Sequence, residues 1–204
     1  DGENYYHAAI QEQHERGYPI SPAPTVRLPT SALLISALGP KISHALILSL
    51  ALVVTVVATV QIGNVALSRL QRIGAAFLLL PSLVILGPMS IYLHETWSVL
   101  LIFLSVLIAR RSFTLSLLLA CLAFAFRELV APYFFAMAIY EYFRGQRKSA
   151  IIWAATGFSC IFSYSLHILA LNNALEGMEP ITSSESASWF AFGGWPFIVG
   201  SVRS

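Results

Sequence analysis

The sequence predicts an all-α protein: a polytopic bundle of transmembrane helices with an external loop that carries an amphipathic helix. Of the 204 residues, 57% are hydrophobic and only 11% are charged, whereas soluble domains carry about 25% charged residues. Because so few charges cannot cover a water-facing surface of this size, the composition excludes soluble, disordered, nucleic-acid-binding and disulfide-scaffold classes. A succession of long apolar stretches, separated by short charged turns, favours membrane spans instead.

Residues 1–40 form a polar N-terminal segment that we expect to lie outside the membrane as a loop. The pattern over residues 3–16 predicts an amphipathic helix, which Gly17 and Pro19 end. Residues 18–29 are rich in proline and therefore predict an extended connection to the first membrane-embedded part.

The first apolar part predicts a short helix followed by a span. Thr30 is a suitable N-cap for a helix over residues 31–38, which Gly39 and Pro40 end. Residues 42–62 then contain no Asp, Glu, Lys or Arg. This stretch is long enough to cross a hydrocarbon layer of about 30 Å.

Further apolar stretches follow at about residues 73–93, 97–109, 112–126, 129–143 and 150–171. Two of them, 97–109 and 112–126, are short, since about 1.5 Å per residue gives roughly 20–23 Å. One merged helix would place Arg110 and Arg111 in the middle of the membrane, where charges are costly. We therefore expect two short helices that a basic turn joins.

The charged turns alternate along the chain. Basic residues gather in every second turn: Arg69, Arg72, Arg110, Arg111, Arg144, Arg147 and Lys148. The turns between them contain His94-Glu95 and Arg127-Glu128. By the positive-inside rule, the basic turns are cytoplasmic and the intervening turns are external.

This alternation divides the chain into three regions. Residues 1–40 are the external loop, residues 41–171 are a transmembrane bundle of about six helices, and residues 172–204 are a second external loop with the start of a further helix. The chain begins at Asp1 without an initiator Met and ends at Ser204 in a new apolar stretch. We therefore expect a piece of a larger protein. Its expected location is the inner (plasma) membrane of a bacterium.

Five charged residues, Asp1, Glu3, Glu95, Arg127 and Glu128, share the predicted external side. Carboxylates held in a cavity of low dielectric next to an arginine can act as general base and anion clamp. Arginine is also a natural partner for phosphate. The short helices place the last three groups at membrane depth, where they require a wet cavity or mutual pairing.

Structural interpretations of these residues stay open at this stage. Arg127-Glu128 also fits an interfacial ion pair, and His94-Glu95 fits a solvated cap on a helix that begins at Thr96.

Other residues of the external loop also have structural interpretations. Asp1 and Glu3 fit the acidic residues that are common at a helix start. His7 and His14 share one helix face with Gln11, but no Cys or carboxylate set accompanies them, so we assign no metal site.

Histidine and tyrosine residues near or within apolar segments predict packing contacts. His44 and His167 lie in apolar spans and fit hydrogen-bonded helix-packing residues. Tyr5 and Tyr6, near a helix start, fit an interfacial aromatic belt as well as a site role.

Residues 1–9, with the sequence DGENYYHAA, resemble the first external loop of the GT-C superfamily. These integral-membrane glycosyltransferases, among them dolichyl-phosphate-mannose mannosyltransferases, take sugar from a polyprenyl-phosphate donor. Their loop typically has an acidic residue or pair, a Tyr and an Ala-rich amphipathic helix, and then segments similar to residues 17–19 and 27–29. Residues 94–95 resemble their second external turn, and residues 127–128 fit their paired short spans. Gly2 separates the acids that are often adjacent in the family, which leaves open whether Asp1 or Glu3 is its acid.

The resemblance implies a GT-C-like bundle that transfers a hexose or pentose to a lipid, glycan or protein acceptor at the external face. It implies that Asp1 is the catalytic base with Glu3 in support, and that Arg127 binds the donor phosphate. The residues implied to line the acceptor cavity are Tyr5, Tyr6, His94, Glu95 and Glu128.

The resemblance implies partners in the bilayer and no nucleic acid. It implies no cofactor besides the lipid-phosphate-linked sugar, and the need for a divalent cation stays open. An alternative is a transporter or flippase-type protein that uses the same charged residues as a substrate or proton path.

Overall fold

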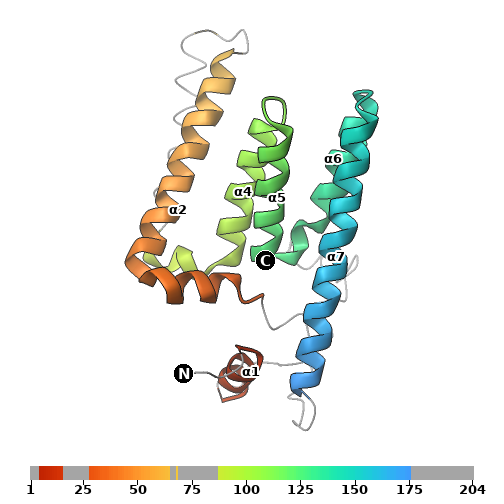
Figure 1. Cartoon of the computed structure of the whole chain (residues 1–204). Coiled ribbons are helices and arrows are strands. Elements are labelled where there is room, and N and C mark those ends of the chain that lie inside the picture. The colour runs from red at the N-terminus through yellow and green to blue at the C-terminus, as the bar shows by residue number, and fades with distance from the viewer. Residues whose placement is uncertain (1–4, 16–27, 65–67, 69–86, 176–204) are drawn as a thin grey trace, which may run out of the picture. The chain divides into compact units, whose positions relative to one another are not determined.

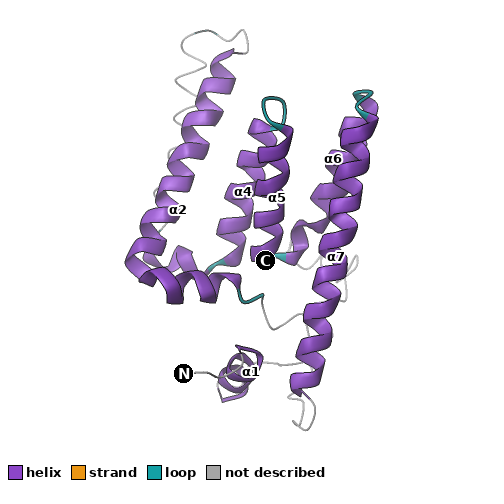
Figure 2. Cartoon of the chain, in the orientation of Figure 1, coloured by secondary structure: helices purple, strands orange, loops and turns teal. Residues whose placement is uncertain are grey.

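The computed structural model describes residues 5–15, 28–64, 68 and 87–175, and in these ranges all regular structure is helical (Figure 2). The elements are α1 (Tyr5–Glu15), α2 (Thr30–Asn64), η2 (Pro88–Tyr92), α4 (His94–Ile108), α5 (Phe113–Phe126), η3 (Glu128–Val130), α6 (Ala131–Phe143) and α7 (Arg147–Leu175). The all-helical prediction is therefore confirmed for this part of the chain. Most of the predicted stretch 73–93, and nearly all of residues 172–204, lie outside the described residues.

The chain forms two compact units. One unit is Leu28–Tyr164, and the other combines residues 1–27 with residues 165–204. In the described part of the chain, Thr30–Gln61 of α2 and Arg147–Leu175 of α7 are long and apolar enough to cross a membrane. These two helices favour a membrane protein weakly. A chain that crosses the membrane about six times remains a prediction.

Helix α2 bends at the Gly-Pro pair that the sequence marks as a boundary (Figure 1). Gly39 has φ 77° and ψ 160°, a conformation that an L side chain rarely adopts, and Pro40 follows it without an N–H to donate. The Ser43 hydroxyl donates to the Gly39 carbonyl oxygen at 2.9 Å. The predicted short helix and the following span are thus the two arms of α2.

The prediction that Thr30 caps this helix is wrong in its chemistry. Thr30 is the first residue of α2, and its hydroxyl donates to the carbonyl oxygen of Ala125 at the end of α5. A tertiary hydrogen bond to a distant helix end has replaced the local cap, which the sequence could not reveal.

Helices α4 and α5 form an antiparallel hairpin, as the pair of short helices was predicted to do (Figure 1). The turn holds Arg110 and Arg111, and Ser112 caps α5 because its hydroxyl accepts from the Leu115 N–H at 3.3 Å. Helix α4 begins at His94 rather than at the predicted Thr96, so Glu95 lies in its first turn and not before it.

The hydroxyl groups of two buried serines and of the partly buried Tyr133 join α4, α5 and α6. The Ser105 hydroxyl donates to the Ser116 carbonyl oxygen at 2.7 Å and lies 2.9 Å from the Tyr133 hydroxyl. The Ser116 hydroxyl donates in return to the Ser105 carbonyl oxygen at 2.9 Å. Both serines are fully buried, so these bonds satisfy polar groups where water is excluded.

The apolar core of the larger unit continues between α6 and the first part of α7. Phe134 and Trp153 are almost completely buried, with ring centroids 5.9 Å apart. Gly157 on α7 lets the two helices approach, because a Cβ atom there would lie 2.9 Å from the Phe134 Cβ.

In the smaller unit, α1 packs on the last turns of α7. Ile10 is buried against Leu171 and Ala174. The Tyr6 hydroxyl lies 3.0 Å from His167 Nδ1, which confirms His167 as a hydrogen-bonded packing residue.

Many large apolar side chains remain exposed on the long helices. Examples are Leu52 and Val56 on α2, and Phe158 and Phe162 on α7. Water would solvate such surfaces poorly, whereas lipid chains cover them without cost, which agrees with a membrane location.

Candidate functional site

The charged residues at the open end of the α4–α5 hairpin form one group, the Arg127 cluster, which consists of Glu95, Arg127 and Glu128. Arg127 Nη2 lies 3.3 Å from Glu95 Oε1, and Arg127 Nη1 lies 3.9 Å from Glu128 Oε1. The charge pattern along the chain predicts these residues on one side of the membrane. The structure brings them into contact.

The antiparallel hairpin explains this contact, since the first turn of α4 meets the end of α5. Trp97 and Phe126 hold the two ends together, because their rings stack with centroids 5.2 Å apart and planes within 7°. The Trp97 indole N–H donates to the Ile91 carbonyl oxygen at 3.0 Å, which fixes the ring against η2. Glu95 precedes Trp97 by two residues and Arg127 directly follows Phe126, so both lie next to this stacked pair.

Backbone geometry adds to the placement of Arg127. The residue ends α5 with φ −149° and ψ 116°, so the chain leaves the helix in an extended conformation before η3 begins. Its N–H still donates to the Ala123 carbonyl oxygen at 3.0 Å. Glu128 is in the first turn of η3, next to the guanidinium.

Burial differs sharply within the Arg127 cluster. The side chains of Arg127 and Glu128 are 12% and 14% exposed, whereas that of Glu95 is 52% exposed. Among the described residues, Arg127 Nε and Nη1 have no hydrogen-bond partner, although both atoms are buried. A guanidinium normally satisfies its buried N–H groups, so this pair of donors is suited to an oxygen-rich ligand or to water.

The Arg127 guanidinium can bind an anion while the carboxylates of Glu95 and Glu128 hold the guanidinium in place. A guanidinium recognises phosphate or carboxylate oxygens through paired N–H donors. With the guanidinium charged and both carboxylates ionised, the cluster has a formal charge of −1, so a bound phosphate would compete with the acids for Arg127. Within the described residues, no group of three or more His, Cys, Asp or Glu side chains is arranged to hold a metal ion.

Of the remaining predicted site residues, the structure describes the side chains of Tyr6 and His94. Asp1 and Glu3 lie outside the described residues, as does the side chain of Tyr5. Tyr6 contacts His167 in the smaller unit. His94 is the first residue of α4, next to Glu95.

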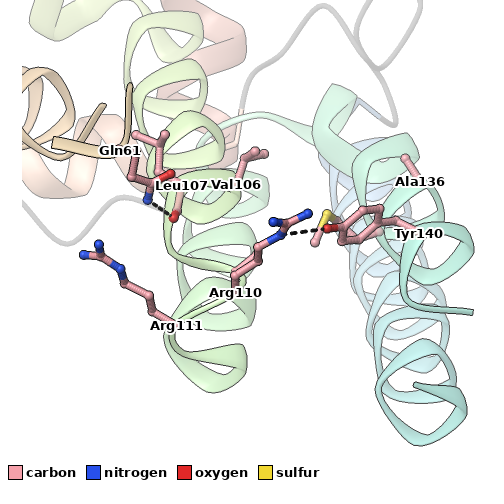
Figure 3. A pocket seen from close by; sticks show the side chains of 9 residues that line it. Gln61, Val106, Leu107, Arg110, Arg111, Ala136 and Tyr140 are labelled. Atoms are coloured by element: carbon pink, nitrogen blue, oxygen red, sulfur yellow. Dashed lines mark hydrogen bonds between the residues drawn. The ribbon is translucent and has the colours of Figure 1, made fainter. Parts of the chain in front are cut away.

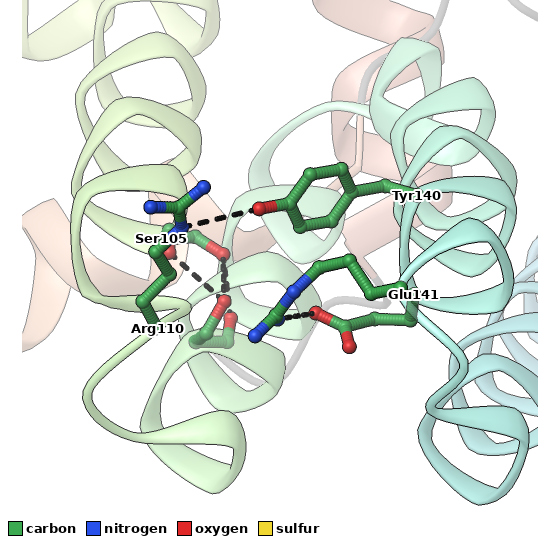
Figure 4. Close-up of polar contacts among 6 residues, drawn as sticks. Ser105, Arg110, Tyr140 and Glu141 are labelled. Carbon is green, nitrogen blue, oxygen red and sulfur yellow. Dashed lines mark hydrogen bonds and ion pairs between the residues drawn. The ribbon is translucent and has the colours of Figure 1, made fainter.

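A second polar site lies at the closed end of the hairpin, and the sequence analysis did not recognise it. Arg110 Nε donates to the Tyr140 hydroxyl at 3.3 Å (Figure 4). This hydrogen bond raises the pKa of Arg110, whose guanidinium is charged at physiological pH in any case. The sequence pattern of Arg110 and Arg111 predicted only the orientation of the chain in the membrane. Tyr140, on the same predicted side at the end of α6, could have indicated a hydrogen-bond partner for them.

Comparisons of this chain with protein-family models, with curated proteins and with solved structures give no match. Its function must therefore be argued from its own residues.

Proposed function

We propose that this chain belongs to a membrane glycosyltransferase that takes sugar from a polyprenyl-phosphate donor, with Arg127 as the ligand of the donor phosphate. The observation that supports this proposal most directly is the Arg127 guanidinium. It is buried at the end of a short helix pair, it is held by two carboxylates, and two of its nitrogen atoms have no hydrogen-bond partner among the described residues.

The chemistry that follows is an inverting transfer. The acceptor hydroxyl attacks the anomeric carbon, the bond from that carbon to the lipid phosphate breaks, and the acceptor proton passes to a carboxylate. Asp1 is the proposed base, on the resemblance of residues 1–9 to the GT-C loop. Negative charge builds on the departing phosphate, where Arg127 would stabilise it electrostatically. Glu95 and Glu128 would hold the guanidinium in place.

The test is transfer of radiolabelled sugar by the full-length protein in proteoliposomes. A panel of polyprenyl-phosphate hexoses and pentoses serves as donor, with lipid extracts of the host membrane as acceptor. We expect Arg127→Ala to lower the transfer rate by about 10²–10³-fold, the usual effect of removing one electrostatic donor. We expect Asp1→Asn to lower it by about 10²-fold or more, as for loss of a general base.

Arg144→Ala is the matched control, because Arg144 is also paired with a glutamate, Glu141, at 2.9 Å. It lies in the basic turn after α6 and should leave transfer within about twofold of the wild-type rate. Arg127→Lys keeps the charge but not the paired donors, so intermediate transfer would support a phosphate contact.

Equal losses of folded protein and of activity in Arg127→Ala would favour a purely structural ion pair. Normal transfer by both Arg127→Ala and Asp1→Asn would refute the proposal. Uptake of labelled lipid-linked sugar into the vesicles without any transfer would instead support the transporter alternative.

A further inference from the structure

The closed end of the α4–α5 hairpin contains a cavity that the proposed transfer reaction does not use. Its volume is about 620 Å³, and residues from α2, the end of α4 and α6 line it (Figure 3). The polar residues among them are Gln61, Arg110, Arg111 and Tyr140. This cavity lies at the opposite end of α4 and α5 from the Arg127 cluster, so the two sites are distinct.

The charged side chains that line this cavity are both arginines, so its formal charge is positive. In the part of the chain that the structure describes, neither Arg110 nor Arg111 forms an ion pair. The nearby carboxylate of Glu141 is already paired with Arg144 at 2.9 Å. Two arginines that have no carboxylate partner among the described residues make this end of the hairpin complementary to an anion.

Hydrogen bonds hold the walls of the cavity in place. The Tyr140 hydroxyl accepts from Arg110 Nε, which directs the guanidinium across the cavity toward α6 (Figure 3). On the other side, the Gln61 amide donates to the Leu107 carbonyl oxygen, which links the end of α2 to the last turn of α4. The Arg110 Nη atoms therefore remain available for a ligand in a site whose sides are fixed.

An apolar groove of about 370 Å³ adjoins the cavity, because Val106 lines both. The groove lies between α2 and α4, and apart from Thr55 its lining is apolar: Ala51, Val54, Val99, Leu100, Ile102, Phe103 and Val106. From Val106 back to Val99 it follows α4 for about 10 Å at 1.5 Å per residue. A positively charged cavity that opens into an apolar groove matches a molecule with an anionic head and a hydrocarbon chain.

We propose that an anionic phospholipid of the bilayer binds here, with its phosphate at Arg110 and Arg111 and an acyl chain in the groove between α2 and α4. The predicted topology places this end at the cytoplasmic leaflet, where acidic lipids attract basic residues near the membrane surface. The bound lipid fills the space between α2 and the α4–α5 hairpin, and by contacting both it holds them at the same depth in the bilayer. The proposal does not depend on the transferase activity.

The test is lipid binding to the purified full chain in detergent, measured by native mass spectrometry. Phosphatidylglycerol is the anionic probe and phosphatidylcholine the zwitterionic one. We expect phosphatidylglycerol to bind several-fold more tightly. Arg110→Ala should weaken it by about fivefold or more, the effect of one basic residue near an anionic headgroup. Lys148→Ala removes an exposed charge from a neighbouring basic turn, outside the cavity, and should change binding less than twofold.

The groove requires its own variant. Val106→Trp fills the junction of cavity and groove at a half-exposed position and should weaken phosphatidylglycerol binding by a similar factor. Leu118→Trp, at an exposed site on α5 outside both spaces, is the control. Circular dichroism of each variant checks that its helices are retained.

Three results would overturn the proposal. Equal binding of the two phospholipids would remove the role of charge. Unchanged binding in both Arg110→Ala and Val106→Trp would remove the site. Displacement of phosphatidylglycerol by millimolar inorganic phosphate, with no effect of Val106→Trp, would show that the cavity takes a free anion and not a lipid.

Discussion

Replacing Gly157 by alanine tests how closely α6 and α7 pack. Two opposing effects act at this position. Within a helix, alanine is more favourable than glycine by about 1 kcal/mol, because it loses less backbone entropy on folding. Against this, the new Cβ would lie 2.9 Å from the Phe134 Cβ and 3.3 Å from the Phe135 Cζ.

The contact with Phe134 decides whether Gly157→Ala stabilises or destabilises the protein. Carbon atoms prefer separations of about 3.5–4.0 Å, so this pair overlaps by at least about 0.6 Å. The Phe135 ring can rotate away, but the Phe134 Cβ is attached to the backbone and moves only with α6. Overpacking of a fixed core costs about 1–3 kcal/mol, and so short a contact favours the upper part of this range. After the gain of about 1 kcal/mol from replacing glycine in a helix, we expect Gly157→Ala to lower the free energy of unfolding by about 1–2 kcal/mol.

The assay is equilibrium unfolding in mixed micelles with increasing SDS, followed by circular dichroism and tryptophan fluorescence, since Trp153 packs against Phe134. Gly87→Ala is the control, because a Cβ at Gly87 meets nothing within 4 Å and the backbone φ is −68°. That variant should be neutral or slightly more stable. A Gly157→Ala protein as stable as the wild type would refute the close approach of the two helices.

Two other outcomes are expected. Ser105→Ala removes the hydroxyl that joins α4 to α5 and α6, and it should destabilise the protein by about 0.6–1.7 kcal/mol in the same assay. Ser159→Ala, whose hydroxyl bonds only within its own exposed helix face, should cost less than about 0.5 kcal/mol, and equal effects would remove the bridging role. In a cysteine-free background, Gln146→Cys should react with an impermeant thiol reagent only after the membrane is opened, whereas Ile20→Cys, in the predicted external loop, should react in intact cells; the reverse pattern would invert the predicted topology.

The helices themselves were largely predictable, because the signals for them are local. Hydrophobic length, the Gly39-Pro40 break and the basic pair Arg110-Arg111 are all visible along the chain, and the structure places helix boundaries close to each. The unfavourable free energy of placing Arg110 and Arg111 in the middle of the membrane also predicted two short helices in place of one long helix.

The contacts between helices were not predictable from the same patterns. The apolar segments lack a strong polar face, so nothing in the sequence indicates which side of a helix meets which neighbour. The Thr30 hydroxyl bonds to a carbonyl oxygen at the end of another helix, and the Ser105–Ser116 pair follows from the register of the hairpin. Serine and threonine are common in such helices, and only their positions in space distinguish a buried bridge from a residue that bonds within its own turn.

For the Arg127 cluster, the shared side of the membrane could be predicted from the sequence, but the contacts between the side chains could not. Topology placed Glu95, Arg127 and Glu128 on one side, and the short helices implied that they must be solvated or paired at depth. The contact of Glu95 with Arg127 depends on the stacking of Trp97 on Phe126, which only the structure reveals. The roles of Asp1 and Glu3 stay a prediction, since both lie outside the described residues.

The length of the hairpin connects the two proposed sites. Helix α4 has 15 residues and α5 has 14, which correspond to about 21–22 Å at 1.5 Å per residue, against a hydrocarbon thickness of about 30 Å. With Arg110 and Arg111 held at the surface by lipid phosphates, the Arg127 cluster at the other end would lie about 8 Å below the opposite surface. At that depth an arginine with unsatisfied N–H groups is costly unless water or an anion reaches it. The basic turn would thus set the depth at which Arg127 meets a lipid-linked phosphate, so weakening lipid binding at Arg110 should also reduce binding of polyprenyl phosphate at Arg127.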